Sequence, residues 1–403
     1  MVHAAGEVLF RLFGRREASN RVSLSQARRV LVVRLDGIGD VVLTSPFLRQ
    51  LRQAAPLAKI TLLVQPFVLN LVERCPYVDE ALTFDPRAPR FLRPLWQHAR
   101  ALSLAFRELL PRHFDWAIHP RWDADRSHAS FVAYFSGAAR RAGYSESVRR
   151  GSARMENRGW DVLLTDACLY GEFKHEVEHN AALLRSLGAS AGDNTSELWP
   201  DDTDWSAAET MWRHHSVYKR DVVIALGLGG EPKRQWPLNN FLQVADSLHR
   251  EFDATILIAG GASEIALAEQ FKKRSRAKTV IAAGFTTLRE TAALLHRANL
   301  YIGNDTGAMH MAAAAGVKVV EISCHPQSGA RTHSNSPLRF GPVGVEHRIL
   351  QPKTALPPCA EGCAAHEPHC IRAIEPADVL AAARELLTEA SVLATHGPVY
   401  EEQ

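Results

Sequence analysis

Short apolar runs and longer stretches of helical periodicity alternate along the chain. The runs at 30–34 (VLVVR) and 60–64 (ITLLV) are rich in aliphatic and β-branched residues and predict buried strands. Between them, segment 41–54 carries apolar residues at roughly helical spacing, and Gly37 and Gly39 allow a tight turn before it. This part of the sequence therefore predicts a strand, a glycine turn and a helix.

The same alternation continues through the second half of the chain. Strands separated by helices of this length indicate parallel sheets covered on both faces. Two such arrays predict an α/β fold of two doubly wound domains facing each other across a cleft, with ligands outside the carboxyl ends of the strands. Further strands are expected at 115–119, 162–164, 222–226, 255–259, 279–282, 300–302 and 317–322, and further helices at 176–187, 241–251, 264–274, 288–297 and 308–315.

The domain organisation follows from length and from one change in composition. At about 150 residues per domain, 403 residues predict two to three domains. Segment 188–206 is rich in Gly, Ser, Asp, Thr and Pro and is interpreted as a linker. We therefore expect a basic tail at 1–29, a first domain at 30–200, a second at 218–375, and a C-terminal helix and tail at 376–403 that packs back toward the first domain.

Composition narrows the class of protein. The chain is 46% hydrophobic and 23% charged, as is typical of soluble globular proteins. No run approaches the roughly 18–20 apolar residues of a membrane span, and the arginines of the first 16 residues follow too short an apolar stretch for a secretory signal. Six cysteines are too sparse for a disulfide scaffold and favour a reducing compartment.

The formal net charge of +3 conceals an uneven distribution. Residues 1–29 carry six Arg against two Glu, and residues 86–160 carry fourteen Arg and no Lys against six acids, a local charge of +8. A solvated surface explains such clustering in the simplest way. The alternative is an anionic partner, because the planar arginine fork matches phosphate geometry.

The first motif is RLDGIGDVVLTSP, residues 34–46. A dinucleotide fingerprint would require a third glycine at the position of Val42, which disfavours a nicotinamide cofactor. Asp40 is predicted to lie at the start of the following helix. It is therefore either a helix N-cap or a general base that takes a proton from an acceptor hydroxyl.

Three further segments place polar residues after predicted strands. Lys233 and Arg234 form either a surface basic loop or a phosphate clamp. Asp305, Thr306 and Gly307 form either an ordinary helix cap or an anion site made of helix amides, and His310 follows on the first turn, where a structural role is the simpler interpretation. Glu264, in the first turn of a predicted helix, either interacts favourably with the helix dipole or accepts hydrogen bonds from ribose hydroxyls. Cys359, Cys363 and Cys370, with His366 and His369, could form a zinc site, although their spacing is not a standard one.

In this order and spacing, RLDGIGD (34–40), KRQWP (233–237) and GNDTGAMHMAAA (303–314) resemble the family-9 glycosyltransferases, heptosyltransferases that use ADP-heptose to build the inner core of lipopolysaccharide. The resemblance runs from about Val30 to about Leu387 and includes FDWAIHPRWDADRS and HEVEHNAALLRSLG. It departs at 323–326, where SCHP stands in place of a Gly-Pro-Thr-like run.

The resemblance implies a GT-B type fold of two Rossmann-like domains, the first binding the acceptor and the second the nucleotide sugar. It also implies inverting transfer of heptose from ADP-heptose to a lipopolysaccharide core or another lipid-linked glycan, with no required cofactor or metal. Asp40 is then the catalytic base, and Gly37, Gly39, Arg121 and Asp123 lie on the acceptor side. The donor residues that it implies are Lys233 or Arg234 for the departing diphosphate, Asp305, Thr306, Gly307 and His310 around it, and Glu264 for the ribose.

The expected partners are thus a nucleotide sugar and an anionic lipid-linked glycan, not nucleic acid. The expected location is the cytoplasm, peripheral on the inner face of the cytoplasmic membrane. Three alternatives remain at this point: a nucleotide-sugar epimerase of the same fold, which would need no acceptor; a dinucleotide-dependent oxidoreductase; and a non-catalytic binder of nucleotide or nucleic acid.

Overall fold

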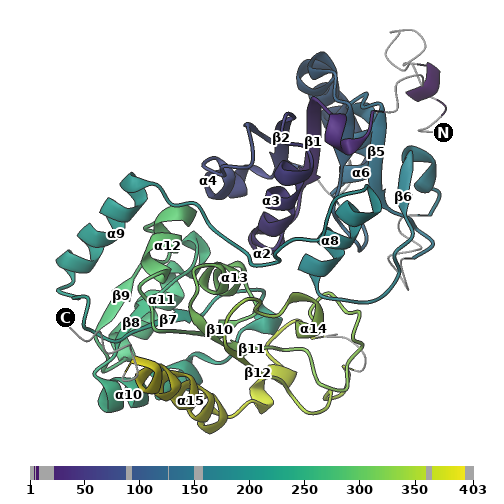
Figure 1. The fold of residues 1–403 in the computed structure, drawn as a ribbon. Coiled ribbons are helices and arrows are strands. Elements are labelled where there is room, and N and C mark those ends of the chain that lie inside the picture. Colours follow the sequence, from purple (N-terminus) through teal and green to yellow (C-terminus); the bar gives the residue numbers. More distant parts are fainter. Residues whose placement is uncertain are drawn as a thin grey trace, which may run out of the picture. The chain divides into compact units, whose positions relative to one another are not determined.

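The computed structural model describes residues 4, 6–8, 22–87, 93–125, 127–148, 158–359 and 365–394. The chain divides into two compact units, Met1–Thr195 and Ser196–Gln403, and each contains its own sheet (Figure 1). The boundary lies inside the expected linker. The interval between the two expected domains, 201–217, contains helix α9 (Asp202–His214), which Asp201 caps by accepting hydrogen bonds from two backbone N–H groups.

The first unit is built on six parallel strands in the order β3-β2-β1-β4-β5-β6. After their first residue, the inner strands β1 and β2 are completely buried, because helices cover both faces. The strands are β1 (Arg29–Arg34), β2 (Lys59–Val64), β3 (Glu80–Thr83), β4 (Trp116–Ile118), β5 (Arg140–Tyr144) and β6 (Asp166–Cys168).

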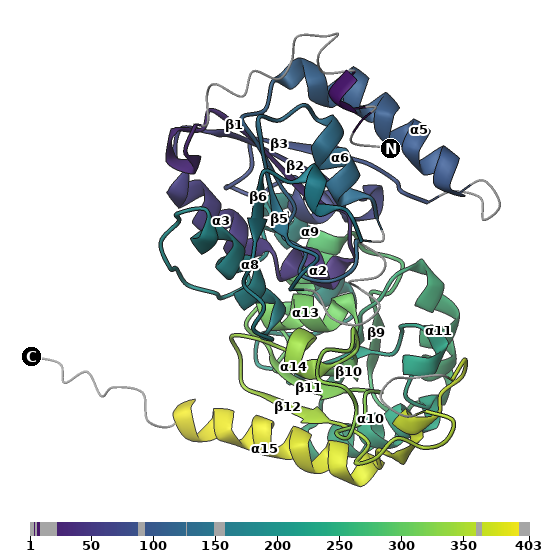
Figure 2. The ribbon, with the colours of Figure 1, turned by 90° about the vertical axis from the view of Figure 1, so that its right-hand side faces the viewer.

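Helices pack on both faces of this sheet. Figure 2 shows α3 with α8 on one side and α5 with α6 on the other, and the members of each pair contact each other. The helices are α2 (Ile38–Val42), α3 (Ser45–Ala54), α4 (Leu69–Val72), α5 (Arg93–Leu104), α6 (Ala129–Phe135) and α8 (Glu176–Ser186). The aromatic side chains of α6 and the aliphatic side chains of β1 share one buried cluster.

The second unit repeats the plan with the order β12-β11-β10-β7-β8-β9, again all parallel. Its strands are β7 (Val223–Gly227), β8 (Thr255–Ile258), β9 (Thr279–Ile281), β10 (Leu300–Asn304), β11 (Lys318–Ile322) and β12 (His347–Leu350). Its helices after α9 are α10 (Leu238–Phe252), α11 (Ile265–Arg274), α12 (Leu288–Leu295), α13 (Gly307–Ala314), α14 (Pro337–Phe340) and α15 (Pro376–Ala394).

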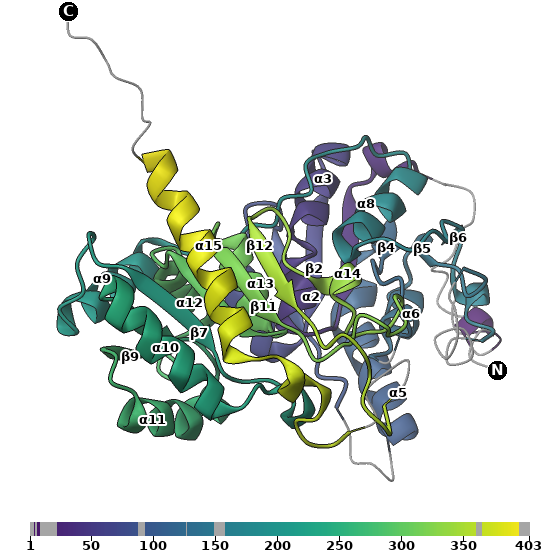
Figure 3. The same cartoon turned by 90° about the horizontal axis from the view of Figure 1, so that it is seen from below.

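Helix α15 packs on the second unit. It contacts α10 and strands β10, β11 and β12 (Figure 3), and Val379, Ala383 and Leu386 are buried in the core of that unit. Its apolar face is therefore covered by its own sheet, and the rest of the expected helix and tail, 395–403, lies outside the described residues. Among the described segments, no helix combines the length and apolarity needed to cross a membrane.

Two expected elements differ in the structure. The strand expected at 162–164 is a 3-10 turn, Asp161–Leu163. The single helix expected at 41–54 is two helices, α2 and α3, because Pro46 has no N–H to donate to the carbonyl of Val42. Four strands were not predicted, and three of them, β3, β6 and β12, are sheet edges with few apolar residues.

In each sheet, the strand order creates a topological switch point between two neighbouring strands, and the loops that follow these two strands lie beside it. In the first sheet β1 and β4 are neighbours whose following strands lie on opposite sides, and in the second sheet β7 and β10 have the same relation. In open parallel sheets, ligands bind outside the carboxyl ends of such strands. The segments that follow these four strands contain the three motifs that carry the family resemblance.

Candidate functional site

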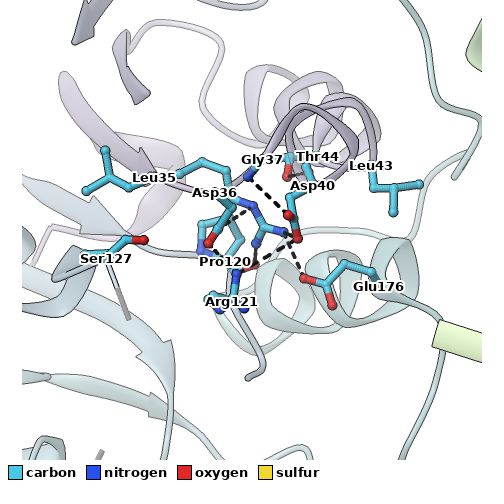
Figure 4. Close-up of polar contacts among 12 residues, drawn as sticks. Leu35, Asp36, Gly37, Asp40, Leu43, Thr44, Pro120, Arg121, Ser127 and Glu176 are labelled. Carbon is cyan, nitrogen blue, oxygen red and sulfur yellow. Dashed lines mark hydrogen bonds and ion pairs between the residues drawn. The ribbon is translucent and has the colours of Figure 1, made fainter. Parts of the chain in front are cut away.

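A fully buried arginine ends strand β1 and organises the first cluster. The Arg34 guanidinium forms ion pairs with Asp36 at 3.1 Å, with Asp40 at 3.1 Å and with Glu176 at 2.9 Å. It also donates a hydrogen bond to the backbone carbonyl of Pro120, in the loop after β4. Figure 4 shows the side chains of Asp36 and Asp40, from one short segment, and of Glu176, from α8, pointing toward one another.

Asp40 is the third residue of the short helix α2 and not its N-cap, which was one of the two roles predicted for it. Gly37 is the N-cap, and its N–H donates to Oδ2 of Asp40 at 3.2 Å, while Gly39 lies within the helix. The other carboxylate oxygen faces Arg34. The Asp40 side chain remains 23% exposed, so a ligand can reach it.

The second arginine of the cluster follows β4. Arg121 binds Asp36 directly, and its guanidinium lies 4.0 Å from Asp40 and 3.9 Å from Asp123. Its Nε–H donates to the carbonyl of Ala124, which fixes the loop. The structure thus brings together all the acceptor-side residues predicted from the sequence.

Electrostatics within this cluster favour an Asp40 that takes up a proton readily. Burial, and then the negative charge of Asp36, raises the pKa of Asp40, and the opposing charges of Arg34 and Arg121 do not cancel the effect. Burial alone would lower the pKa of Arg34, but the surrounding carboxylates outweigh it and the pKa is raised. Arg34 therefore stays charged while Asp40 becomes a stronger base than an ordinary aspartate.

Sequence reasoning did not assign Arg34, Asp36 or Glu176. Glu176 is the first residue of α8 and is completely buried, 142 positions from its partner Arg34. One signal was present in the sequence: a charged residue ending an apolar strand inside the RLDGIGD motif requires a buried counter-charge. Glu176 itself could not be chosen without knowing that α8 packs against α3.

The second cluster surrounds the loop after β7. Asn304, buried at the end of β10, donates to the carbonyls of Leu228 and Gly229 at 3.1 and 2.9 Å and accepts from the N–H of Trp236 at 3.0 Å. These three hydrogen bonds hold the loop that carries Arg234 against the start of α13. The sequence pattern placed Asn304 in a turn and did not indicate this role.

The two candidate cations of this loop differ in their contacts. Arg234 forms an ion pair with Asp305 at 3.4 Å and donates to the side chain of Asn335. Lys233 pairs with Glu231 at 3.2 Å in the same loop. Arg234 also lies 3.8 Å from Glu231. Of the two, only Arg234 contacts Asp305, so it is the cation held beside the predicted anion site.

Helix α13 presents its N-terminus at this point. Thr306, not Asp305, is the N-cap, and within the described residues its hydroxyl makes no capping hydrogen bond. Gly307 is the first helical residue, and the amides of a first turn have no intrahelical partner. His310 lies on the same helix, 3.9 Å from Asp305.

Two glycines bring Glu264 into the same region. A Cβ on Gly229 would lie 2.5 Å from Cγ of Glu264, and a Cβ on Gly230, whose φ is +117°, would lie 3.2 Å from the Thr306 methyl group. The β7 loop thus passes between Glu264 and Thr306. Glu264 ends a 3-10 turn before α11, and its carboxylate accepts the N–H of Gly261.

Two buried titratable groups border this cluster. Burial, and then the negative charge of Asp305, raises the pKa of Glu321 on β11 well above its ordinary range. In segment 323–326 (SCHP), where the sequence departs from the family pattern, burial and then the neighbouring His333 lower the pKa of His325 to about 4. Cys324 of the same segment lies 3.9 Å from the Asn335 amide that also holds Arg234. The segment at 323–326 therefore lies next to Arg234 through Asn335.

The predicted cysteine cluster is only partly within the described residues. Cys359 and Cys370 are buried and lie beside His369, whereas Cys363 lies outside the described residues. Taken together, the first unit offers a carboxylate suited to accept a proton. The second offers an arginine, helix amides and a carboxylate suited to a sugar nucleotide.

Comparison with known proteins agrees with this chemistry. Glycosyltransferase family 9 (heptosyltransferase) matches residues 104–341, which include the Arg234 loop and α13 but not Asp40. Lipooligosaccharide heptosyltransferase 2 of Haemophilus ducreyi is 22% identical over 71% of this chain and 80% of its own length. Lipopolysaccharide heptosyltransferase 2 of Salmonella typhimurium is 24% identical over the same shares.

Solved structures share the fold. A family-9 glycosyl transferase from Veillonella parvula aligns with a TM-score of 0.75 at 22% identity, covering 91% of this chain and 98% of that one. The ADP-heptose lipopolysaccharide heptosyltransferase II of Escherichia coli aligns with a TM-score of 0.66 at 19% identity, covering 90% and 99%. These likenesses confirm the predicted α/β fold of GT-B type with two Rossmann-like sheets.

Proposed function

The chain belongs to glycosyltransferase family 9, and from this premise we propose that it transfers a heptose from ADP-heptose to a lipopolysaccharide core or another lipid-linked glycan, with inversion at the anomeric carbon. The observation that carries the proposal is Asp40, a reachable carboxylate whose pKa burial raises within a cluster of fixed charges. Support for the donor and the acceptor comes from the heptosyltransferases that the chain is similar to.

In the proposed reaction, Asp40 accepts the proton of an acceptor hydroxyl as that oxygen attacks the anomeric carbon. The bond between that carbon and the diphosphate oxygen breaks, and the electron pair leaves with ADP. Because the hydroxyl attacks from the side opposite the leaving group, the configuration inverts. Arg34 and Arg121 hold the carboxylate in place and stabilise it before the proton arrives.

On the donor side, Arg234 neutralises the charge that develops on the departing diphosphate. The amides of Thr306 and Gly307 bind its oxygens at the N-terminus of α13, where the helix dipole favours an anion. Glu264 accepts hydrogen bonds from the ribose hydroxyls. Protein cations and amides supply the positive charge in this scheme, so a divalent metal is not required for the transfer.

We propose that the acceptor is anionic and that the first unit meets a membrane surface at the inner face of the cytoplasmic membrane. Trp96 and Phe106, in α5 and the turn that follows it, are 49% and 43% exposed. Arg100 and Arg107 accompany them along the same stretch. Amphipathic aromatic rings flanked by arginines suit the headgroup region of an anionic membrane.

The test incubates the full chain with ADP-heptose, with and without a lipopolysaccharide acceptor that lacks its heptoses, and follows products by mass spectrometry. The proposal predicts a heptose added to the acceptor and ADP released only when acceptor is present. Conversion of the nucleotide sugar without acceptor would instead indicate an epimerase. A binding screen of ADP-, UDP-, GDP- and dTDP-sugars tests the nucleotide, with ADP expected to bind most tightly.

A further inference from the structure

A compact group of soft ligands lies between β12 and α15, in a segment that neither candidate cluster uses. Nδ1 of His369 is 3.7 Å from Sγ of Cys359 and 3.4 Å from Sγ of Cys370. The ligand atoms of the three residues all lie within 4.8 Å of one another. We propose that Cys359, His369 and Cys370 together bind one thiophilic divalent metal ion, zinc.

The spacing of these atoms matches the ligand shell of zinc. Zinc–sulfur bonds of about 2.3 Å and zinc–nitrogen bonds of about 2.0–2.1 Å, at the tetrahedral angle, separate sulfur from nitrogen by about 3.6 Å. The two observed sulfur–nitrogen distances, 3.4 and 3.7 Å, lie on either side of this value. Both distances therefore fit an imidazole nitrogen and two thiolates bound to one zinc ion.

The chemistry of the donors selects the metal. Two thiolates and an imidazole favour zinc over magnesium or calcium, which prefer oxygen ligands. Both cysteines are buried, and the N–H of Leu356 donates to Sγ of Cys370 at 3.4 Å, a contact that orients a thiolate ligand. Three protein ligands leave the fourth tetrahedral position to water or to another donor.

The site would anchor a segment that supports the Arg234 loop. Cys370 begins the 3-10 turn Cys370–Ala373, after which the carbonyl of Ile374 accepts a hydrogen bond from the indole N–H of Trp236 at 2.9 Å. Trp236 follows Arg234 by two positions and is itself tied to Asn304. A bound ion thus stabilises the turn that positions the clamp. This effect on donor binding rests on the proposed function, whereas metal binding itself does not.

The experiment measures zinc binding by the full chain, stripped of metal under reducing conditions and titrated with zinc alone against a chromophoric chelator. We expect one zinc ion per chain, and a cobalt-substituted protein with a thiolate-to-metal absorption band. Cys359→Ser and Cys370→Ser should each weaken zinc binding at least about tenfold. Cys168→Ser, which removes a buried cysteine of the first unit, is the matched control and should bind zinc like the unmodified chain.

Absence of zinc binding by the unmodified chain, or an equal loss in Cys168→Ser, would overturn the proposal, as would a Cys359–Cys370 disulfide that persists under those conditions. If the serine variants do not fold, alkylation of the unmodified chain replaces them: zinc should protect Cys359 and Cys370 and leave the reactivity of Cys168 unchanged. Unprotected ligand cysteines would refute the site. Zinc binding without any change in ADP affinity would contradict the anchoring role and leave the metal site standing.

Discussion

Replacing Arg234 by methionine tests whether its guanidinium is the clamp for the donor diphosphate. Asp305 and Asn335 already hold the guanidinium in place, so little order is lost when an anion binds. Its Nε–H is buried, lies 3.8 Å from the Glu231 carboxylate and donates no hydrogen bond within the described part of the chain. A diphosphate oxygen would supply the missing acceptor, whereas methionine keeps most of the side-chain volume and removes every donor.

The magnitude follows from the charged hydrogen bond to the diphosphate that methionine cannot make. A hydrogen bond to a charged group contributes about 1.5–3 kcal/mol, and each 1.4 kcal/mol changes Kd about tenfold. We therefore expect Arg234→Met to weaken ADP binding by about 10- to 150-fold. The ADP affinity of Arg234→Lys should lie between those of the unmodified chain and of Arg234→Met, because lysine keeps the charge and loses the planar fork.

Calorimetric titration of ADP into each variant measures the effect. Lys233→Met removes the neighbouring cation, which pairs with Glu231. The loss of ADP affinity in this variant should be clearly smaller than in Arg234→Met. Arg250→Met removes an exposed arginine of α10 and should leave Kd unchanged. An Arg234→Met protein that binds ADP as well as the unmodified chain, or no worse than Lys233→Met, would refute the assignment.

Three further results are expected. The single-turnover rate of transfer should fall as the pH is lowered, with an apparent pKa above the ordinary aspartate range, because Asp40 must be unprotonated and its pKa is raised. A fall in rate with the ordinary aspartate pKa would contradict this. The folded chain holds the proton of Glu321 more tightly than the unfolded chain, so its stabilising effect is full at low pH and is lost as pH rises toward the raised pKa. Relative to the unmodified chain, the Tm of Glu321→Gln should therefore rise as pH increases from about 5 to about 8, and a constant Tm difference would contradict this. Added salt should slow acceptor turnover more than it weakens ADP binding, because exposed charges are screened; an equal response would speak against an anionic acceptor.

The sequence predicted the central strands and the motif segments that follow them, for a physical reason. Strands such as β1 and β7 are buried on both faces and therefore appear as apolar runs, and glycines mark the turns at their carboxyl ends. Asp40, Arg234 and Thr306 lie in the segments that follow such strands, so their positions could be predicted before the fold was known.

What the sequence could not predict depends on contacts distant along the chain. Glu176 can be identified only through its partner Arg34. Helix α15 was expected from the sequence, but the strands that cover it could be identified only from the fold. The local positive charge around segment 86–160 is also lower than the sequence of the segment alone indicates, because acids from outside the segment pair with its arginines. Arg112 pairs with Glu80 and Arg140 with Asp166, so neighbouring acids balance part of the excess of arginine.

The central claim is that Asp40 removes the proton of the acceptor hydroxyl, and single-turnover transfer by Asp40→Asn tests it most directly. Asparagine preserves the shape of the side chain and an oxygen for the N–H of Gly37. Asp85→Asn is the matched control, since Asp85 lies in the same unit, pairs with Arg87 and is 25% exposed against 23% for Asp40. We predict that Asp40→Asn binds ADP normally and transfers heptose about 10²- to 10⁴-fold more slowly, while Asp85→Asn transfers at the unmodified rate. Full transfer by Asp40→Asn would contradict the account.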